Sequence, residues 1–160
     1  MIIVIEGLIL CVLLVLYCLI GIRNGAVGLV HLYEKDVQER AIELGLTTSQ
    51  KIKKNGAYFK IIGLVMYFAY AIICVYVING ADNFLEGFWQ MTAIFLIMGV
   101  FDRIVIDGIW VGYTKTWVIP GTEDLRPYIP IKVHIKKWII TLVVYPLASA
   151  FIAGIMTLLL

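Results

Sequence analysis

Four apolar stretches, each long enough to cross a lipid bilayer as a helix, dominate this chain of 160 residues. They cover residues 2–22, 57–78, 86–113 and 138–160. About 20 apolar residues in a helix span the ~30 Å hydrocarbon layer. The chain is 62% hydrophobic, whereas a soluble domain is roughly half apolar. We therefore predict an all-α, polytopic membrane protein, in which residues 1–160 form a single domain of four transmembrane helices.

The first stretch lies where a secretory signal peptide would lie. It lacks a basic start, its apolar run is too long, and no small-residue cleavage site follows it. We therefore expect residues 2–22 to be a retained span. Glu6 lies near the first end of this span, and we expect its side chain to snorkel to the membrane surface.

Basic residues gather in the two long connections, residues 23–56 and 114–137. The first carries Arg23, Lys35, Arg40, Lys51, Lys53 and Lys54, and the last carries Lys115, Arg126, Lys132, Lys136 and Lys137. The short connection between the second and third stretches carries none. The positive-inside rule predicts a multi-pass protein of the cell membrane with both connections in the cytoplasm and both termini outside. Trp110, Trp117 and Trp138 are expected at the inner interface.

The first connection is predicted to be a cytoplasmic helical hairpin. Residues 26–44 have a helical pattern, and Gly45 is expected to end that helix. Thr47 and Gln50 are spaced as a capping box for a second short helix over residues 48–54.

The last connection begins with the turn signal Pro120-Gly121 and continues into a segment, residues 129–137, in which apolar and polar residues alternate. This alternation fits an extended segment or the first turn of the last helix. Pro146 predicts a kink in that helix.

Asp102, Arg103 and Asp107 lie inside the third apolar stretch. An ionisable group at membrane depth costs about 2.5–3.5 kcal/mol or more, so such groups usually face protein or water. Arg103 and Asp107 are four residues apart and can pair along one helix. Asp102 is about 100° away around an α-helix, so it is expected to need a partner from another element. The candidate partners are Arg23, His31, Lys60, Arg126 and His134.

These charges lead to the functional hypothesis of a charged pocket that faces the cytoplasm. Asp102 would be its base or ligand, Arg103 and Asp107 its supporting pair, and Glu123 or His134 its lid residues. The pocket would bind or act on an amphiphilic or small anionic ligand at the inner leaflet. The sequence leaves open whether the protein is an enzyme, and it contains no metal-ligand spacing, cofactor motif or nucleophile signature.

Three other interpretations remain open. The charges can be an interfacial cluster that fixes only helix packing, the protein can be a non-enzymatic scaffold or assembly partner, or it can be an ion- or proton-coupled carrier. Membrane lipids are the expected partners, and a net charge of +2 does not point to nucleic acid. The small-residue pairs Gly108/Gly112, Ala150/Gly154 and Ser149/Ala153 would allow close helix packing within the bundle, or a homo-oligomer if they faced outward.

The segments Phe101-Asp102, Asp107–Trp110 and Ile119–Asp124 together resemble a pattern in small four-span bacterial integral membrane proteins of unassigned function. The resemblance implies that the following residues belong together: Asp102, Asp107, Pro120, Gly121, Thr122 and Glu123. The order of spans and the large first loop also resemble the membrane-associated glutathione and eicosanoid enzymes. That family carries Arg, Asn and Glu on its second helix for thiol binding, and residues 61–78 contain none of them. This second likeness therefore concerns architecture only.

Overall fold

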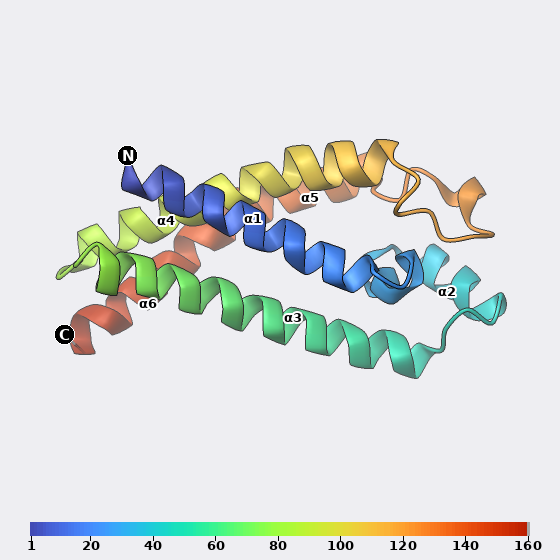
Figure 1. The fold of residues 1–160 in the computed structure, drawn as a ribbon, viewed down its shortest axis with the longest axis horizontal. Coiled ribbons are helices and arrows are strands. Elements are labelled where there is room, and N and C mark those ends of the chain that lie inside the picture. Colours follow the sequence, from blue (N-terminus) through green and yellow to red (C-terminus); the bar gives the residue numbers. More distant parts are fainter. Residues whose placement is uncertain (160) are drawn as a thin grey trace.

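The computed structural model describes residues 1–159, and within that range the chain is 81% helix and contains no strand. The predicted all-α class is confirmed. Four long helices, drawn in Figure 1, form the body of the molecule. Their regular α-helical parts are α1 (Ile2–Ile22), α3 (Ser49–Ile72), α4 (Phe84–Phe101) and, in the last helix, α5 (Ile131–Ile139) with α6 (Tyr145–Leu159).

Three of the four long helices contain a π-helical segment, in which each turn is wider than in an α-helix. These segments are η2 (Ile73–Ile78) after α3, η3 (Asp102–Val111) after α4, and η5 (Ile140–Val144) between α5 and α6. Pro146 lies two residues after the end of η5. Because proline has no N–H, it cannot donate a hydrogen bond to the carbonyl four residues before it. The wider turn of η5 therefore lies where the sequence predicted a kink.

Three helices are long and apolar enough to cross a membrane: Ile2–Ile22, Ser49–Ile78 and Ile131–Leu159. The helix formed by α4 and η3, where the fourth crossing was predicted, is not one of these three. The last helix begins at Ile131 instead of Trp138, so the helical alternative for residues 129–137 is correct. The predicted end of this span, Leu160, lies outside the described residues.

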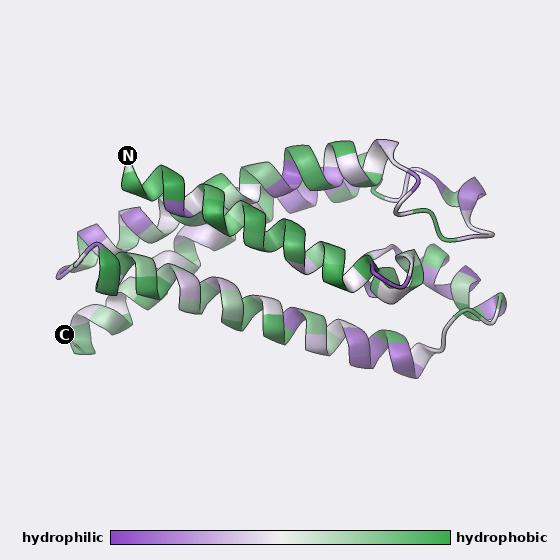
Figure 2. Cartoon of the chain, in the orientation of Figure 1, coloured by the Kyte–Doolittle hydropathy of each residue, from purple (hydrophilic) through white to green (hydrophobic). Residues whose placement is uncertain are grey.

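The helices run along the long axis of the molecule, and the chain changes direction at its two ends (Figure 1). The start of α1, the end of α6 and the short connection after η2 lie at one end, and the two long connections lie at the other. α4 packs against both α1 and α6, with Leu10, Met91 and Ile94 fully buried between helices. Figure 2 shows apolar residues along most of α1 and over much of α3. Apolar side chains on the outer face of α3, such as Ile61 and Val65, are more than half exposed, as expected where lipid replaces water.

Small residues let the helices approach closely. Ser149 and Ala153 of one predicted pair are fully buried, and glycines outside the predicted pairs make further close contacts. A Cβ on Gly99 would lie 2.6 Å from Thr141 Cγ2, and one on Gly7 would lie 2.9 Å from Ile97 Cβ. A Cβ on Gly154 would meet nothing within 4 Å, and one on Gly108 would meet only the carbonyl of Arg103. Close packing inside the chain therefore uses Gly7 and Gly99, and a role for Gly154 in an oligomer stays a prediction.

The first long connection is not the predicted hairpin. Residues 26–44 are split into η1 (Ala26–Leu32) and α2 (Lys35–Glu43), because Tyr33 and Glu34 adopt extended backbone conformations between them. Gly45 ends α2 with φ +70°, as predicted. The expected second arm is the first part of α3, and Thr48 instead of Thr47 caps it by accepting a hydrogen bond from the Lys51 N–H.

His31 fixes η1 against the start of α3. Its ring lies 5.1 Å from the Phe59 ring, and a Cβ on Gly56 would lie 3.2 Å from His31 Cβ. Neither ring nitrogen has a hydrogen-bond partner within residues 1–159. Burial, and secondarily the positive charge of Lys60, lowers the pKa of His31 below its usual value.

Acid is therefore expected to weaken this contact. The unfolded chain binds the proton of His31 at a higher pH than the folded chain does, so stability falls as the pH drops below about 6.5. The melting temperature of the wild type in detergent should fall more steeply than that of His31→Leu between about pH 8 and pH 5. Parallel curves for the two proteins would show that the His31 ring does not contribute to acid sensitivity.

Candidate functional site

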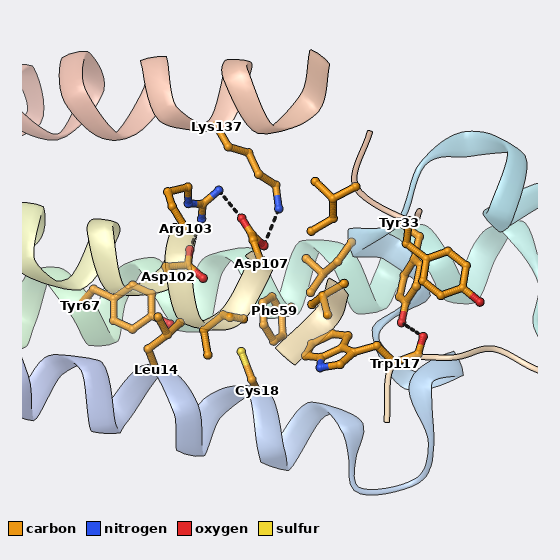
Figure 3. Close-up of a pocket in the computed structure, with 15 residues that line it drawn as sticks. Leu14, Cys18, Tyr33, Phe59, Tyr67, Asp102, Arg103, Asp107, Trp117 and Lys137 are labelled. Atoms are coloured by element: carbon orange, nitrogen blue, oxygen red, sulfur yellow. Dashed lines mark hydrogen bonds and ion pairs between the residues drawn. The ribbon is translucent and has the colours of Figure 1, made fainter. Parts of the chain in front are cut away.

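The π-helical geometry of η3 places Asp102 and Asp107 on the same side of one helix. Residues five apart are about 140° apart around an α-helix. In a π-helix the bonds run from each residue to the fifth one along, which brings residues at that spacing toward one face. Both carboxylates therefore line one cavity, as Figure 3 shows. The expectation that Asp102 points elsewhere assumed an α-helix and is wrong.

Arg103 bridges the two carboxylates. One of its terminal nitrogens, Nη2, bonds to Asp102 Oδ2, and the other, Nη1, lies 2.8 Å from Asp107 Oδ2. Within residues 1–159, the partner of Asp102 is thus its own neighbour and none of the five candidates proposed from the sequence. The long guanidinium side chain, together with the wider helical turn, makes this neighbour contact possible.

A second cation comes from another helix. Lys137 of α5 places its Nζ 2.8 Å from Asp107 Oδ1. We call Asp102, Arg103, Asp107 and Lys137 the charge quartet. From the sequence, Lys137 belongs to the basic connection before the last span, and nothing links it to the charges of the third apolar stretch. Its neighbourhood depends on α5 beginning at Ile131, which brings Lys137 onto a helix beside η3.

The charge quartet is largely removed from solvent. The exposed fractions of the side chains are 6% for Asp107, 10% for Arg103, 17% for Asp102 and 30% for Lys137. Two negative and two positive charges give a formal sum of zero. Buried ions persist when pairing offsets the loss of hydration, and each member of the charge quartet lies against an opposite charge, although Arg103 Nε and Asp107 Oδ2 have no hydrogen-bond partner within residues 1–159.

A cavity of about 320 Å³ lies beside the charge quartet. Its other side is mainly apolar and comes from two helices, with Leu14 and Cys18 from α1 and Phe59 and Tyr67 from α3. The volume is at the small end of the range for ligand-binding cavities, about 300–1,000 Å³. The cavity therefore combines a charged wall with an apolar wall, a combination that suits a molecule with a polar head and a hydrocarbon chain.

Three aromatic residues, Tyr33, Trp117 and Tyr128, line the end of the cavity nearest the long connections; we call them the aromatic lid. The Tyr33 hydroxyl donates a hydrogen bond of 2.5 Å to the Trp117 carbonyl, and the Tyr33 and Tyr128 rings meet edge to face at 5.1 Å. Burial raises the pKa of Tyr33, which keeps its hydroxyl protonated as a donor. These contacts tie the two long connections together. Trp117 is only 3% exposed, so it is a lid residue and not the membrane-interface anchor expected from the sequence.

The structure separates the two predicted lid residues from this cavity. Glu123 is exposed, and its Oε2 accepts a hydrogen bond from the Gly121 N–H. His134 lines a neighbouring cavity of about 270 Å³ together with Arg126, and Asp107 borders both cavities. Of the predicted site residues, the structure therefore brings together Asp102, Arg103 and Asp107, places His134 next door, and leaves Glu123 outside.

A second polar cluster lies at the opposite end of the bundle. Glu6 is 4% exposed and does not snorkel to the surface, because Asn79 at the end of η2 supplies a donor for it. Asn79 Nδ2 donates to Glu6 Oε2 at 3.1 Å and to Gln90 Oε1 at 2.9 Å. The Tyr70 hydroxyl also donates to the Glu6 carbonyl oxygen. These bonds hold α1, the end of the second long helix and α4 together.

Apolar side chains separate this cluster from the charge quartet. Gln90 and Asp102 are twelve residues apart, or about 18 Å along the helix. Met91 and Ile94 are fully buried in this interval, and Phe95 is 3% exposed. The two polar sites are therefore separate features of the bundle.

Across residues 1–159, no group of three or more His, Cys, Asp or Glu side chains is arranged to hold a metal ion. The residues described at the site form ion pairs and hydrogen bonds. The chain matches no protein-family model, no curated protein and no solved structure. The family resemblances noted from the sequence accordingly stay predictions, and the geometry of the charge quartet carries the functional argument.

Proposed function

We propose that this chain is a four-span membrane protein that binds a single-chain amphiphile at the inner leaflet. In this proposal the two long connections are cytoplasmic and both termini are outside. The three membrane-capable helices support it, as does the packing of α4 between two of them, since a helix enclosed in this way would cross alongside its neighbours. The basic residues of both long connections also belong to one end of the molecule, which is the pattern of a cytoplasmic side.

The observation that carries the binding proposal is the charge quartet on one wall of an otherwise mainly apolar cavity. The head of an amphiphile would meet Asp102 and Lys137, and its chain would follow Leu14 and Phe59. This arrangement satisfies both halves of such a ligand at once, because apolar burial stabilises the chain and polar groups orient the head.

Within the charge quartet, Asp102 is the group we assign to ligand contact. Asp107 is held by two cations, whereas Asp102 is held only by Arg103 and is the more exposed of the two carboxylates. Asp102 therefore retains acceptor capacity for a hydroxyl or amide group of the ligand. Arg103 and Asp107 act as positioning residues that hold the Asp102 carboxylate at the cavity wall.

Filling the cavity should abolish binding. Cys18 lines the cavity and Val12 points out of the bundle on the same helix with 58% of its surface exposed. In native mass spectrometry from lipid nanodiscs, the wild type should retain monododecanoylglycerol, and Cys18→Trp should lose at least about tenfold in occupancy. Val12→Trp, which adds the same side chain on the lipid-facing side, should behave as wild type.

Equal occupancy of the folded Cys18→Trp protein and the wild type would contradict the proposal. Circular dichroism and thermal unfolding establish whether that variant is folded. If Cys18→Trp does not fold, ligand occupancy is measured instead in Leu14→Phe, which enlarges a side chain of the same cavity wall by less.

The other interpretations receive less support. A carrier needs a polar path across the bundle, and fully buried apolar side chains such as Met91 and Ile94 fill the interval between Gln90 and Asp102. A scaffold whose charges serve only packing needs no cavity at Asp102, yet one of about 320 Å³ borders it.

A further inference from the structure

We infer that the head group of this amphiphile is uncharged and bears hydroxyl or amide groups. The inference rests on the proposed binding function and narrows the ligand class: long-chain alcohols, monoacylglycerols and N-acyl amides fit, and fatty acids or alkyl ammonium ions do not. It narrows the sequence-based hypothesis, which allowed an amphiphilic or a small anionic ligand.

The charges on the cavity wall are balanced. Asp102, Arg103, Asp107 and Lys137 are the formally charged residues among those that line the cavity, and their charges sum to zero. A charged head placed among them would leave one unpaired charge in a poorly hydrated site. Such an uncompensated buried charge costs several kcal/mol, whereas a neutral head adds no such cost.

Both cations of the cavity wall already lie against carboxylates. Arg103 uses both terminal nitrogens on carboxylates, and Lys137 lies 2.8 Å from Asp107. An anionic head would therefore meet cations whose charge the two carboxylates already neutralise, and it would add a negative charge to a balanced wall of low dielectric constant.

The ion-paired residues keep unused hydrogen-bonding capacity on the cavity wall. An ammonium group has three N–H donors, and one of those of Lys137 is used on Asp107. Asp102 keeps free acceptor positions on its carboxylate. A head that both donates and accepts, such as a hydroxyl group, can bond to Lys137 and Asp102 without breaking an ion pair.

The test compares three ligands that share a dodecyl-length chain and differ in the charge of the head: monododecanoylglycerol, dodecanoate and dodecyltrimethylammonium. Binding is measured with the full chain in nanodiscs of zwitterionic lipid. We expect the neutral ligand to bind at least about tenfold more tightly than either ion. Preference of the wild type for dodecanoate or for the ammonium ligand would overturn the inference.

Charge-changing variants should move this preference in opposite directions. Asp102→Asn leaves the cavity wall with one net positive charge and should shift the preference toward dodecanoate by about tenfold or more. Lys137→Gln leaves one net negative charge and should shift it toward the ammonium ligand. The double variant returns the sum to zero and should favour the neutral ligand again, although with weaker binding.

Two exposed positions provide matched controls. Asp82→Asn and Lys115→Gln make the same chemical changes outside the cavity and should leave the preference unchanged. If the Asp102 and Lys137 variants behave like these controls, the charge of the cavity wall does not select the ligand and the inference is overturned. The proposed function fails in a different way, through absence of binding for all three ligands in the wild type.

Discussion

Replacing Asp107 with Ala is expected to lower the free energy of unfolding by about 3–5 kcal/mol. Asp107 contacts Arg103 and Lys137, each at 2.8 Å, and its side chain is 6% exposed. Its loss leaves two cations facing one remaining carboxylate in a poorly hydrated site. The cost comes from these stranded cations and is therefore larger than the net worth of the original ion pairs.

Thermal unfolding in detergent measures this effect, and Asp124→Ala is the matched control. Asp124 also pairs with an arginine, Arg40, at 3.6 Å, but 62% of its side chain is exposed. The control should change stability by about 0–1 kcal/mol. The double variant Asp107→Ala with Lys137→Met should recover part of the loss, because it removes one stranded cation. Equal melting temperatures for Asp107→Ala and the control would show that the charge quartet is hydrated.

Replacing Gly99 with Leu is expected to separate α6 and η5 from α4 and to destabilise the bundle by about 1–3 kcal/mol or more. A Cβ at this position would already lie 2.6 Å from Thr141 Cγ2 and 2.7 Å from Tyr145 Cε2. Tyr145 has little room to retreat because its ring lies 5.9 Å from that of Phe95. We therefore expect α4 to move away from η5 and α6, which would loosen the packing around Thr141, Tyr145 and Phe95.

Gly154→Leu is the control for this substitution. It adds the same side chain to a neighbouring apolar helix, at a position where a new Cβ would meet nothing within 4 Å. Its melting temperature in detergent should stay close to that of the wild type. A Gly99→Leu protein as stable as Gly154→Leu would mean that the α4–α6 contact tolerates a looser arrangement.

Much of the helical architecture could be predicted from the sequence because bilayer-length apolar runs have few alternatives to helix. The boundaries were harder to predict. Residues 48–54 were assigned to a separate short helix, but Gly56 packs against His31 and α3 continues through it. Similarly, Pro130 marks the start of the last helix, which the alternation after it left ambiguous.

The candidate site was partly predictable for a different reason. Charged residues are rare within long apolar stretches, so Asp102, Arg103 and Asp107 could be recognised as candidate site residues directly from the sequence. Lys137 could not be recognised, because its role depends on packing between η3 and α5. The π-helical turns have no simple periodic pattern in the sequence. The helix face on which Asp102 lies could therefore not be predicted either.

Glu6 and Trp117 show how statistical preferences fail at particular positions. Glutamate near the end of a span usually reaches water, but here Asn79, 73 residues away, supplies a donor inside the bundle. Tryptophan usually lies at the membrane surface, but the carbonyl of Trp117 accepts a hydrogen bond from Tyr33 in the other long connection. Both residues differ from the statistical expectation because of contacts between segments distant in the sequence, and such contacts cannot be predicted from a local sequence pattern.

In the proposed topology, the apolar interval between Gln90 and Asp102 would also set how ligand binding responds to voltage. With that topology, the electric field across the membrane falls mainly over this dry middle section, which contains Met91 and Ile94. A charge gains about 2.3 kcal/mol per 100 mV only if it crosses that field. The charge quartet lies to one side of the drop and its ligand would approach from that same side. Occupancy of the cavity should accordingly be nearly independent of the resting potential of the cell.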